Sequence, residues 1–123
     1  MSKKIFIIDD ADFMINMLSM MMRDAGYTVV GTALNGKLAV ESIKSLSASA
    51  LPDIITLDFH MPQMDGMSTI KHIRTLVPGA RIILISSDST MGVVMKAKNA
   101  GVDAFVVKPF EPQTVLDAIA KFG

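Results

Sequence analysis

The chain contains no cysteine, and this absence excludes two kinds of chemistry. Without thiols it has neither disulfides nor thiolate ligands for a metal ion. A surplus of positive charge is missing as well, because 12 basic side chains balance 12 acidic ones. Binding to a nucleic-acid backbone depends on such a surplus. We therefore expect no direct contact with nucleic acid.

Long apolar runs are also missing. No segment approaches the roughly 20 apolar residues of a membrane span. The first apolar run, Lys4 to Ile8, begins almost at Met1 and stops at Asp9-Asp10, which leaves no room for a signal peptide. Half of the 123 residues are apolar, so a packed core is expected. We predict one cytoplasmic, monomeric domain over residues 1–123.

Five short apolar runs alternate with five segments of helical periodicity. Strands are expected at residues 5–8, 28–33, 53–57, 81–85 and 104–107, and helices near 12–25, 38–46, 66–76, 93–100 and 111–122. Gly26, Pro78-Gly79 and Gly101 end three of the helices. The pattern shows no hairpin between successive strands, so it predicts an α/β fold with a doubly wound parallel sheet and helices on both faces.

The first helix carries more apolar residues than one core-facing stripe needs. The expected stripe consists of Met14, Met17, Leu18, Met21 and Ala25, and the additional residues are Phe13, Ile15, Met20 and Met22. Asp12 is the expected N-cap. Methionine-rich surfaces adapt to partners, so the additional residues form either a docking face or a broad stripe that neighbouring segments cover. For Met20 alone the second interpretation is favoured.

Polar residues follow four of the predicted strands at their carboxyl ends. Asp9 and Asp10 follow the first strand, Asp58 the third, Ser86 the fourth and Lys108 the fifth. If these strands are neighbours, the side chains converge where open α/β sheets bind ligands. Carboxylates about 4 Å apart repel by roughly 4 kcal/mol per pair. Mg²⁺ relieves this repulsion, because it binds a few carboxylates and keeps waters for a phosphate oxygen.

With Mg²⁺ bound, these residues suit phosphoryl transfer. Asp58 is the candidate nucleophile, Lys108 offers a cation to a phosphoryl oxygen, and the Ser86 hydroxyl donates to another. The bond between Lys108 and Pro109 is hypothesised to be cis, because an X-Pro bond adopts that form at a cost of only about 0.5–1 kcal/mol. Each residue alone fits a cap or a turn, and only their conjunction predicts the site.

These residues resemble the response-regulator receiver domains, the CheY-like family of two-component signalling. The resemblance covers the whole chain and rests on Asp9-Asp10, the run Asp58-Phe-His-Met-Pro-Gln-Met-Asp-Gly, Ser86, and Lys108-Pro109-Phe110, in that order. It implies a five-stranded, flavodoxin-like sheet of order 2-1-3-4-5. It also implies that Asp58 accepts a phosphoryl group from a histidine kinase, a histidine phosphotransfer domain or a small phosphodonor.

The resemblance further assigns a task to individual residues. Asp10 and Asp58 bind Mg²⁺ directly, together with the backbone carbonyl of His60, while Asp9 acts through water. Mn²⁺ is the alternative ion. Ser86 is the switch hydroxyl, and Phe105 is the aromatic switch residue three positions before the lysine.

The same resemblance identifies two binding surfaces. The surface of the fourth helix, fifth strand and fifth helix binds a downstream protein. The first helix packs against the kinase's phosphotransfer domain, which makes Phe13 and Met20 a candidate docking face.

The sequence departs from the commonest family pattern near the phosphoacceptor. His60 stands two residues after Asp58, where asparagine is frequent, and Asp88 stands two residues after Ser86. These two positions influence the lifetime of the phosphoryl group in the family. His60 either orders or blocks the attacking water, with Asp88 as a partner, or contributes only its backbone carbonyl.

Several functions remain as alternatives. The chain is expected to be a stand-alone regulator of chemotaxis or of a phosphorelay, but a receiver excised from a larger regulator would have the same sequence. A flavodoxin-like FMN protein is disfavoured, because Asp9, Asp10 and Asp12 would repel its phosphate. An aspartyl-phosphate phosphatase would need an acid at His60. A degenerate receiver would not keep a complete site. We expect a signalling domain that promotes its own phosphorylation and dephosphorylation rather than an enzyme.

Overall fold

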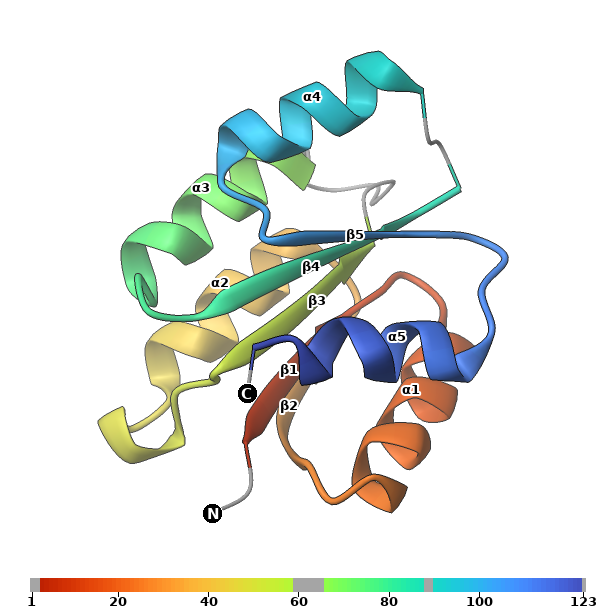
Figure 1. Cartoon of the computed structure of the whole chain (residues 1–123). Coiled ribbons are helices and arrows are strands. Elements are labelled where there is room, and N and C mark those ends of the chain that lie inside the picture. Colours follow the sequence, from red (N-terminus) through yellow and green to blue (C-terminus); the bar gives the residue numbers. More distant parts are fainter. Residues whose placement is uncertain (1–2, 59–65, 88–89, 123) are drawn as a thin grey trace.

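The computed structural model describes residues 3–58, 66–87 and 90–122, which form one parallel sheet covered by helices (Figure 1). Its strand order is β2-β1-β3-β4-β5, which confirms the predicted order 2-1-3-4-5. The strands are β1 Lys4–Ile8, β2 Thr28–Ala33, β3 Ile54–Asp58, β4 Arg81–Ser86 and β5 Ala104–Val107, and the helices are α1 Asp12–Asp24, α2 Gly36–Ser45, α3 Gly66–Leu76, α4 Met91–Ala100 and α5 Pro112–Ala120. None of the described helices is long and apolar enough to cross a membrane.

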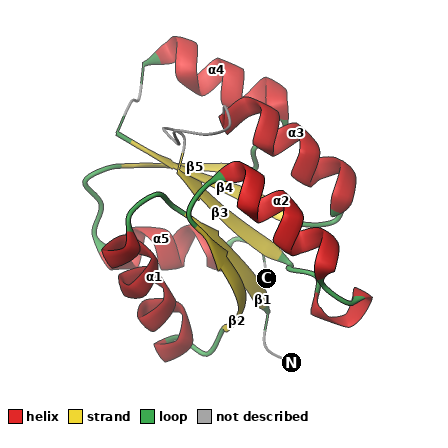
Figure 2. Cartoon of the chain, turned by 180° about the vertical axis from the view of Figure 1, so that it is seen from behind, coloured by secondary structure: helices red, strands yellow, loops and turns green. Residues whose placement is uncertain are grey.

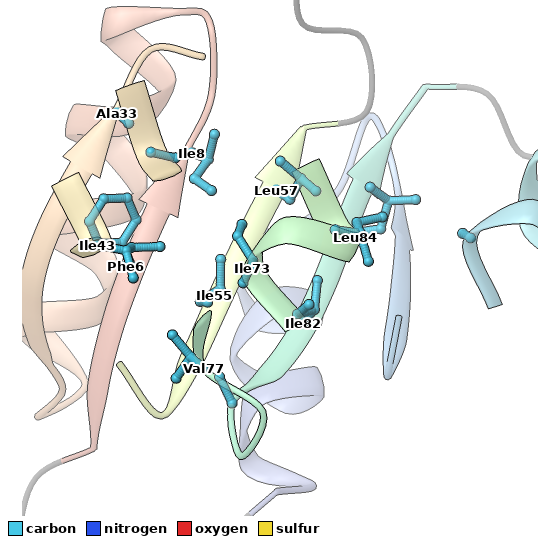
Figure 3. Packing of buried hydrophobic residues seen from close by; sticks show 14 residues of the cluster. Phe6, Ile8, Ala33, Ile43, Ile55, Leu57, Ile73, Val77, Ile82 and Leu84 are labelled. Atoms are coloured by element: carbon cyan, nitrogen blue, oxygen red, sulfur yellow. The ribbon is translucent and has the colours of Figure 1, made fainter. Parts of the chain in front are cut away.

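The sheet separates two apolar cores. Helices α1 and α5 cover one face, and α2, α3 and α4 cover the other (Figure 2). Successive residues of a strand point to opposite faces, so Ile55 and Leu57 of β3 enter the core beneath α2 and α3, while Ile54 enters the core beneath α1 and α5. Figure 3 shows the core beneath α2, α3 and α4. Every residue of β3 is buried, as expected for the central strand of a sheet that is covered on both sides.

The buried stripe of α1 differs from the predicted one. The fully buried residues of the helix are Ile15, Leu18, Ser19 and Met22. Met17, which was assigned to the core, is 39% exposed, and Ala25 is exposed as well. The buried stripe lies about one residue further along the helix than predicted, so the predicted stripe was wrong. Methionine and isoleucine occupy so many positions of α1 that two adjacent stripes both satisfy helical spacing, and only packing selects between them.

The beginning of α1 also differs from the prediction. Ala11 is the N-cap residue, and Asp12 lies in the first turn, where its negative charge suits the helix dipole. The backbone N–H of Ala11 donates to Oδ1 of Asp9 at 3.0 Å. Asp9 therefore fixes the entry to the helix instead of Asp12. Elsewhere the element bounds agree with the prediction to within a few residues, apart from a short 3-10 helix at Ala48–Ala50 that was expected to be a loop.

Candidate functional site

The register of the central strands brings three acids together at the carboxyl edge of the sheet. Ile8 of β1 is paired with Leu57 of β3, so the next residues, Asp9 and Asp58, lie at the same level. One carboxylate oxygen from each of Asp9, Asp10 and Asp58 lies within 4.8 Å of the other two. Asp9 and Asp58 are buried, whereas Asp10 is exposed. The predicted convergence of the three acids is therefore present.

Lys108 reaches this cluster from the end of β5. Its Nζ donates a hydrogen bond to Oδ2 of Asp58 at 2.6 Å and lies 3.8 Å from Oδ2 of Asp9. The bond between Lys108 and Pro109 is cis, as the sequence suggested. The backbone N–H of Lys108 also donates to the carbonyl of Ser86 at 2.8 Å. The ends of β4 and β5 thus hold Lys108 against Asp58.

The pKa of Asp9 is raised from 3.8 to about 6, mainly because the carboxyl group is buried. The charges of Asp58 and Asp10 act in the same direction as burial, while the hydrogen bond from the N–H of Ala11 and the charge of Lys108 oppose it. For Lys108, burial lowers the pKa, but the hydrogen bond and charge of Asp58, together with the other two acids, outweigh burial and raise it. The cluster therefore favours additional positive charge.

The donor set fits a hard divalent cation. It offers carboxylate oxygens, two of its three carboxylates are buried, and their ligand atoms are close enough to share one ion. Mg²⁺ prefers such oxygen ligands and tolerates a small number of them, because it keeps several of its waters. The predicted third ligand, the backbone carbonyl of His60, lies outside the described residues. Residues 59–65, which include it, and Asp88 are not described. The predictions made for these residues stay predictions.

Ser86 and Phe105 lie on the face of the sheet that α3 and α4 cover. Ser86 is fully buried at the end of β4 and follows the alternation of Ile82 and Leu84, which face α3 and α4. Phe105 is half-buried and packs against the same core. A cavity of about 220 Å³ lies between α4 and β5, lined in part by Phe105, Val94 and Ala97. The two predicted switch residues therefore share one face, beneath α4.

The predicted docking residues of α1 are on the surface. Phe13 is 72% exposed and Met20 is 65% exposed. The interpretation favoured for Met20, that neighbouring segments cover it, was therefore wrong. A hollow of about 430 Å³ adjoins this helix and extends to the acidic site, because Met14 and Met17 line it together with Ser87 and Lys108. Nothing in the local sequence pattern indicated this hollow, since α1 and the segment after β5 lie far apart in the chain and meet only in the fold.

The doubly wound sheet and the acidic cluster with its lysine define a receiver-type α/β domain. The chain matches the family model for the response regulator receiver domain over residues 5–120, and it belongs to that family. It is 44% identical over 121 residues to the chemotaxis protein CheY of Thermotoga maritima, with 98% of each chain covered, and 41% identical to CheY of Bacillus subtilis over the same share.

Solved structures agree with this assignment. The structure of a CheX-CheY-BeF3-Mg complex from Borrelia burgdorferi matches with a TM-score of 0.88 at 30% identity, covering 97% of this chain and 87% of the other. The family consists of signalling domains rather than conventional enzymes, and the fold and class predicted from the sequence are confirmed.

Proposed function

We propose that this chain is the phosphoacceptor receiver of a two-component system and that Asp58 accepts the phosphoryl group in a reaction that depends on Mg²⁺. The observation that carries the proposal is the 2.6 Å contact between Lys108 Nζ and Asp58 Oδ2 within a cluster of three acids. Phosphoryl transfer to a carboxylate requires that nucleophile, a cation beside it and hard oxygen donors for a metal.

In the proposed reaction, an oxygen of Asp58 attacks the phosphorus of the donor. The new bond joins that oxygen to phosphorus, and the bond from phosphorus to the donor's leaving group, a histidine nitrogen or an acetate oxygen, breaks. Lys108 then neutralises a non-bridging phosphoryl oxygen in place of the Asp58 carboxylate. Bound Mg²⁺ supplies positive charge to the acids and to the phosphoryl oxygens. Asp10 and Asp58 would hold the ion together with the carbonyl of His60, and Asp9 would act through water.

Phosphorylation of Asp58 would change the conformation of a partner-binding surface through Ser86 and Phe105. A phosphoryl group adds negative charge and acceptor oxygens at one point. The Ser86 hydroxyl would move toward such an oxygen, and the ring of Phe105 would turn into the cavity of about 220 Å³ beneath α4. The surface of α4, β5 and α5 is then the element with two states, and a downstream protein would bind one of them.

The kinase side of the proposal uses α1. Phe13 and Met20 are exposed apolar residues on the helix that borders the acidic site, and the adjoining hollow is mostly apolar. A helix of a histidine kinase or phosphotransfer domain that packs here would bring its histidine close to Asp58. Because several relatives that match nearly the whole chain are chemotaxis proteins, we infer a role of that type for the single domain, acting through protein binding.

The test is the intact mass of the protein after incubation with acetyl phosphate, with and without Mg²⁺. We expect the mass of one phosphoryl group on the wild type only when Mg²⁺ is present, and no label on Asp58→Asn. A label that persists on Asp58→Asn would show that another residue is the acceptor. A wild type that stays unlabelled with Mg²⁺ would overturn the proposal.

A further inference from the structure

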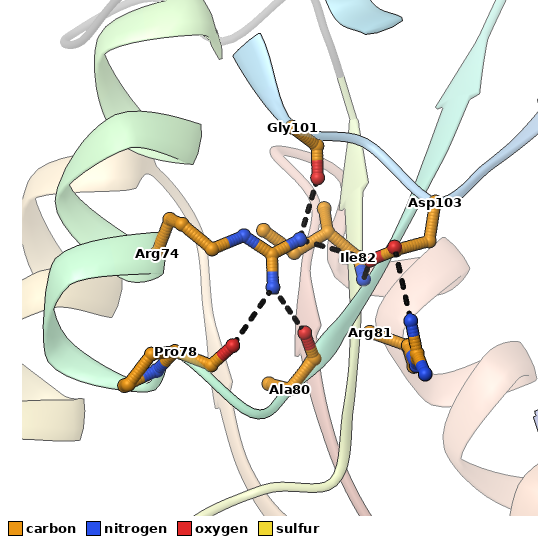
Figure 4. Close-up of polar contacts among 7 residues, drawn as sticks. All are labelled: Arg74, Pro78, Ala80, Arg81, Ile82, Gly101 and Asp103. Atoms are coloured by element: carbon orange, nitrogen blue, oxygen red, sulfur yellow. Dashed lines mark hydrogen bonds and ion pairs between the residues drawn. The ribbon is translucent and has the colours of Figure 1, made fainter.

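A second charged cluster lies at the amino ends of β4 and β5, at the opposite end of the sheet from Asp58. Arg74 projects from α3 into the turn that follows it and toward the end of α4 (Figure 4). Its Nη1 donates to the carbonyls of Ala80 and Pro78, and its Nη2 donates to the carbonyl of Gly101. Nη2 also pairs with Oδ2 of Asp103 at 2.9 Å. One guanidinium thus joins α3 to the segment that links α4 with β5.

Asp103 extends this cluster to β4. Its Oδ2 accepts the backbone N–H of Ile82 at 2.9 Å, and its own backbone N–H donates to the carbonyl of Ile82 at 2.8 Å. Oδ1 lies 3.5 Å from Nη1 of Arg81. Hydrogen bonds to charged groups are stronger than neutral ones, so this end of β4 and the residues after α4 are held firmly together.

The carboxyl end of α4 is held by backbone and charged contacts, whereas the first residue of the helix is exposed. At the carboxyl end, Gly101 adopts a left-handed conformation with φ +108°, and the guanidinium of Arg74 lies against it, 3.4 Å from where a Cβ would stand. Along α4, all of whose residues are described, only Ala97 is fully buried. At the amino end, Met91 is 75% exposed. The cavity of about 220 Å³ lies beside the carboxyl-terminal half of the helix and is lined by Ala97 together with residues 102–105.

We propose that Arg74 is a positioning residue of the switch: it anchors the carboxyl end of α4, so that the helix responds to the phosphorylation site by moving at its amino end and pivots at Gly101. This inference rests on the proposed function. The charged anchor holds the carboxyl end in place and so prevents the whole helix from shifting. Because of this anchor, a structural change near Ser86 moves the amino-terminal half of α4 and leaves the carboxyl end in place.

The test is hydrogen exchange, measured by mass spectrometry on the full chain with and without Mg²⁺ and beryllofluoride as a stand-in for the phosphoryl group. The variant is Arg74→Lys, which keeps the charge but cannot serve four acceptors from one nitrogen. The matched control is Arg81→Lys, because Arg81 also pairs with Asp103 but contacts it from β4 instead of holding Gly101.

In the wild type we expect the ligand to change exchange at residues 91–96 and to leave residues 98–104 within twofold. In Arg74→Lys, exchange at residues 98–104 should rise about tenfold without ligand, as expected for losing a hydrogen bond to a charged group, and the ligand response should spread into that segment. Arg81→Lys should behave like the wild type. Exchange in β1 should stay unchanged in both variants, which separates a local loss of anchoring from global destabilisation.

Four results would overturn the inference. A wild type whose residues 98–104 respond as strongly as residues 91–96 has no pivot. An Arg74→Lys variant with wild-type exchange at residues 98–104 has no anchor at Arg74, and one in which exchange rises equally in β1 shows only lost stability. If the wild type shows no response to the ligand and no label from acetyl phosphate, the proposed function fails and the pivot fails with it.

Discussion

Lys108 and Asp58, which are 50 residues apart in the chain, form a hydrogen-bonded ion pair of 2.6 Å at the carboxyl edge of the sheet. The lysine offsets part of the repulsion among the three acids and occupies space near the position expected for a divalent ion. Lys108→Met should therefore raise the affinity for Mg²⁺ severalfold, since a competing cation is lost. The same change should slow phosphorylation by acetyl phosphate by about tenfold or more, because the phosphoryl oxygens lose a cationic partner.

Calorimetric titration with Mg²⁺ and the rate of mass increase with acetyl phosphate measure these two effects. Lys71→Met is the matched control, because Lys71 is an exposed lysine of α3. It should change neither quantity. An affinity for Mg²⁺ that falls in Lys108→Met would show that the lysine supports ion binding instead of competing with it.

Asp9 should make the metal-free protein less stable as the pH rises. Its folded-state pKa of about 6 lies above the ordinary 3.8, so the folded state holds this proton more tightly than the unfolded state. The contribution to the free energy of unfolding is thus fully present below pH 4 and is lost as the pH rises through 6, a difference of roughly 2–3 kcal/mol. Asp9→Asn should remove this dependence and be the more stable protein at pH 7.

Denaturant unfolding in the presence of a chelator, at several values between pH 4 and pH 8, measures this effect. The stabilities of the wild type and Asp9→Asn should be closest near pH 4, diverge between pH 4 and pH 6, and keep a constant difference above about pH 6. Addition of Mg²⁺ at pH 7 should narrow the gap, since only the wild type gains the full set of ligands. A gap that is constant across this pH range would contradict the assignment of the raised pKa to Asp9.

Phe105→Ala should separate phosphorylation from its structural consequence. The ring is half-buried and lines the cavity between α4 and β5, and none of the three acids lines that cavity. We expect labelling by acetyl phosphate at the wild-type rate, a loss of roughly 1–3 kcal/mol in stability, and no change in hydrogen exchange at residues 91–96 when Mg²⁺ and beryllofluoride bind.

The control for this variant is Phe13→Ala, which removes an exposed ring from the other side of the sheet. It should keep the exchange response of α4. If Phe105→Ala keeps that response as well, the aromatic ring is not the coupling element.

The parts of the fold that were predicted from the sequence are those that local pattern determines. The residues of β3 form a continuous apolar run, and such a run has one plausible structure in an alternating α/β chain. The stripe of α1 was misplaced because neighbouring stripes are almost equally apolar. At the candidate site, the strand ends predicted that Asp9, Asp58 and Lys108 lie together, and the contacts of Lys108 agree with this.

The Arg74 cluster had no comparable sequence pattern. Three of the acceptors that Arg74 holds are backbone carbonyls, those of Pro78, Ala80 and Gly101, and any residue supplies a carbonyl. Only the folded arrangement shows that these groups converge on one guanidinium. The same holds for the cavity beneath α4, whose lining side chains come from the helix, from β5 and from the segment between them.

Charge placed on the exposed face of α1 should block the kinase without harming the site. Phe13→Glu and Met20→Glu each put a carboxylate where the proposed docking surface is apolar. We expect phosphotransfer from a histidine kinase or phosphotransfer domain to slow by at least tenfold, while labelling by acetyl phosphate stays within twofold of the wild type. Met91→Glu is the matched control, because Met91 is an equally exposed methionine on α4. Equal slowing in Met91→Glu, or slowing with acetyl phosphate as well, would show that charge acts generally and not through contact with α1.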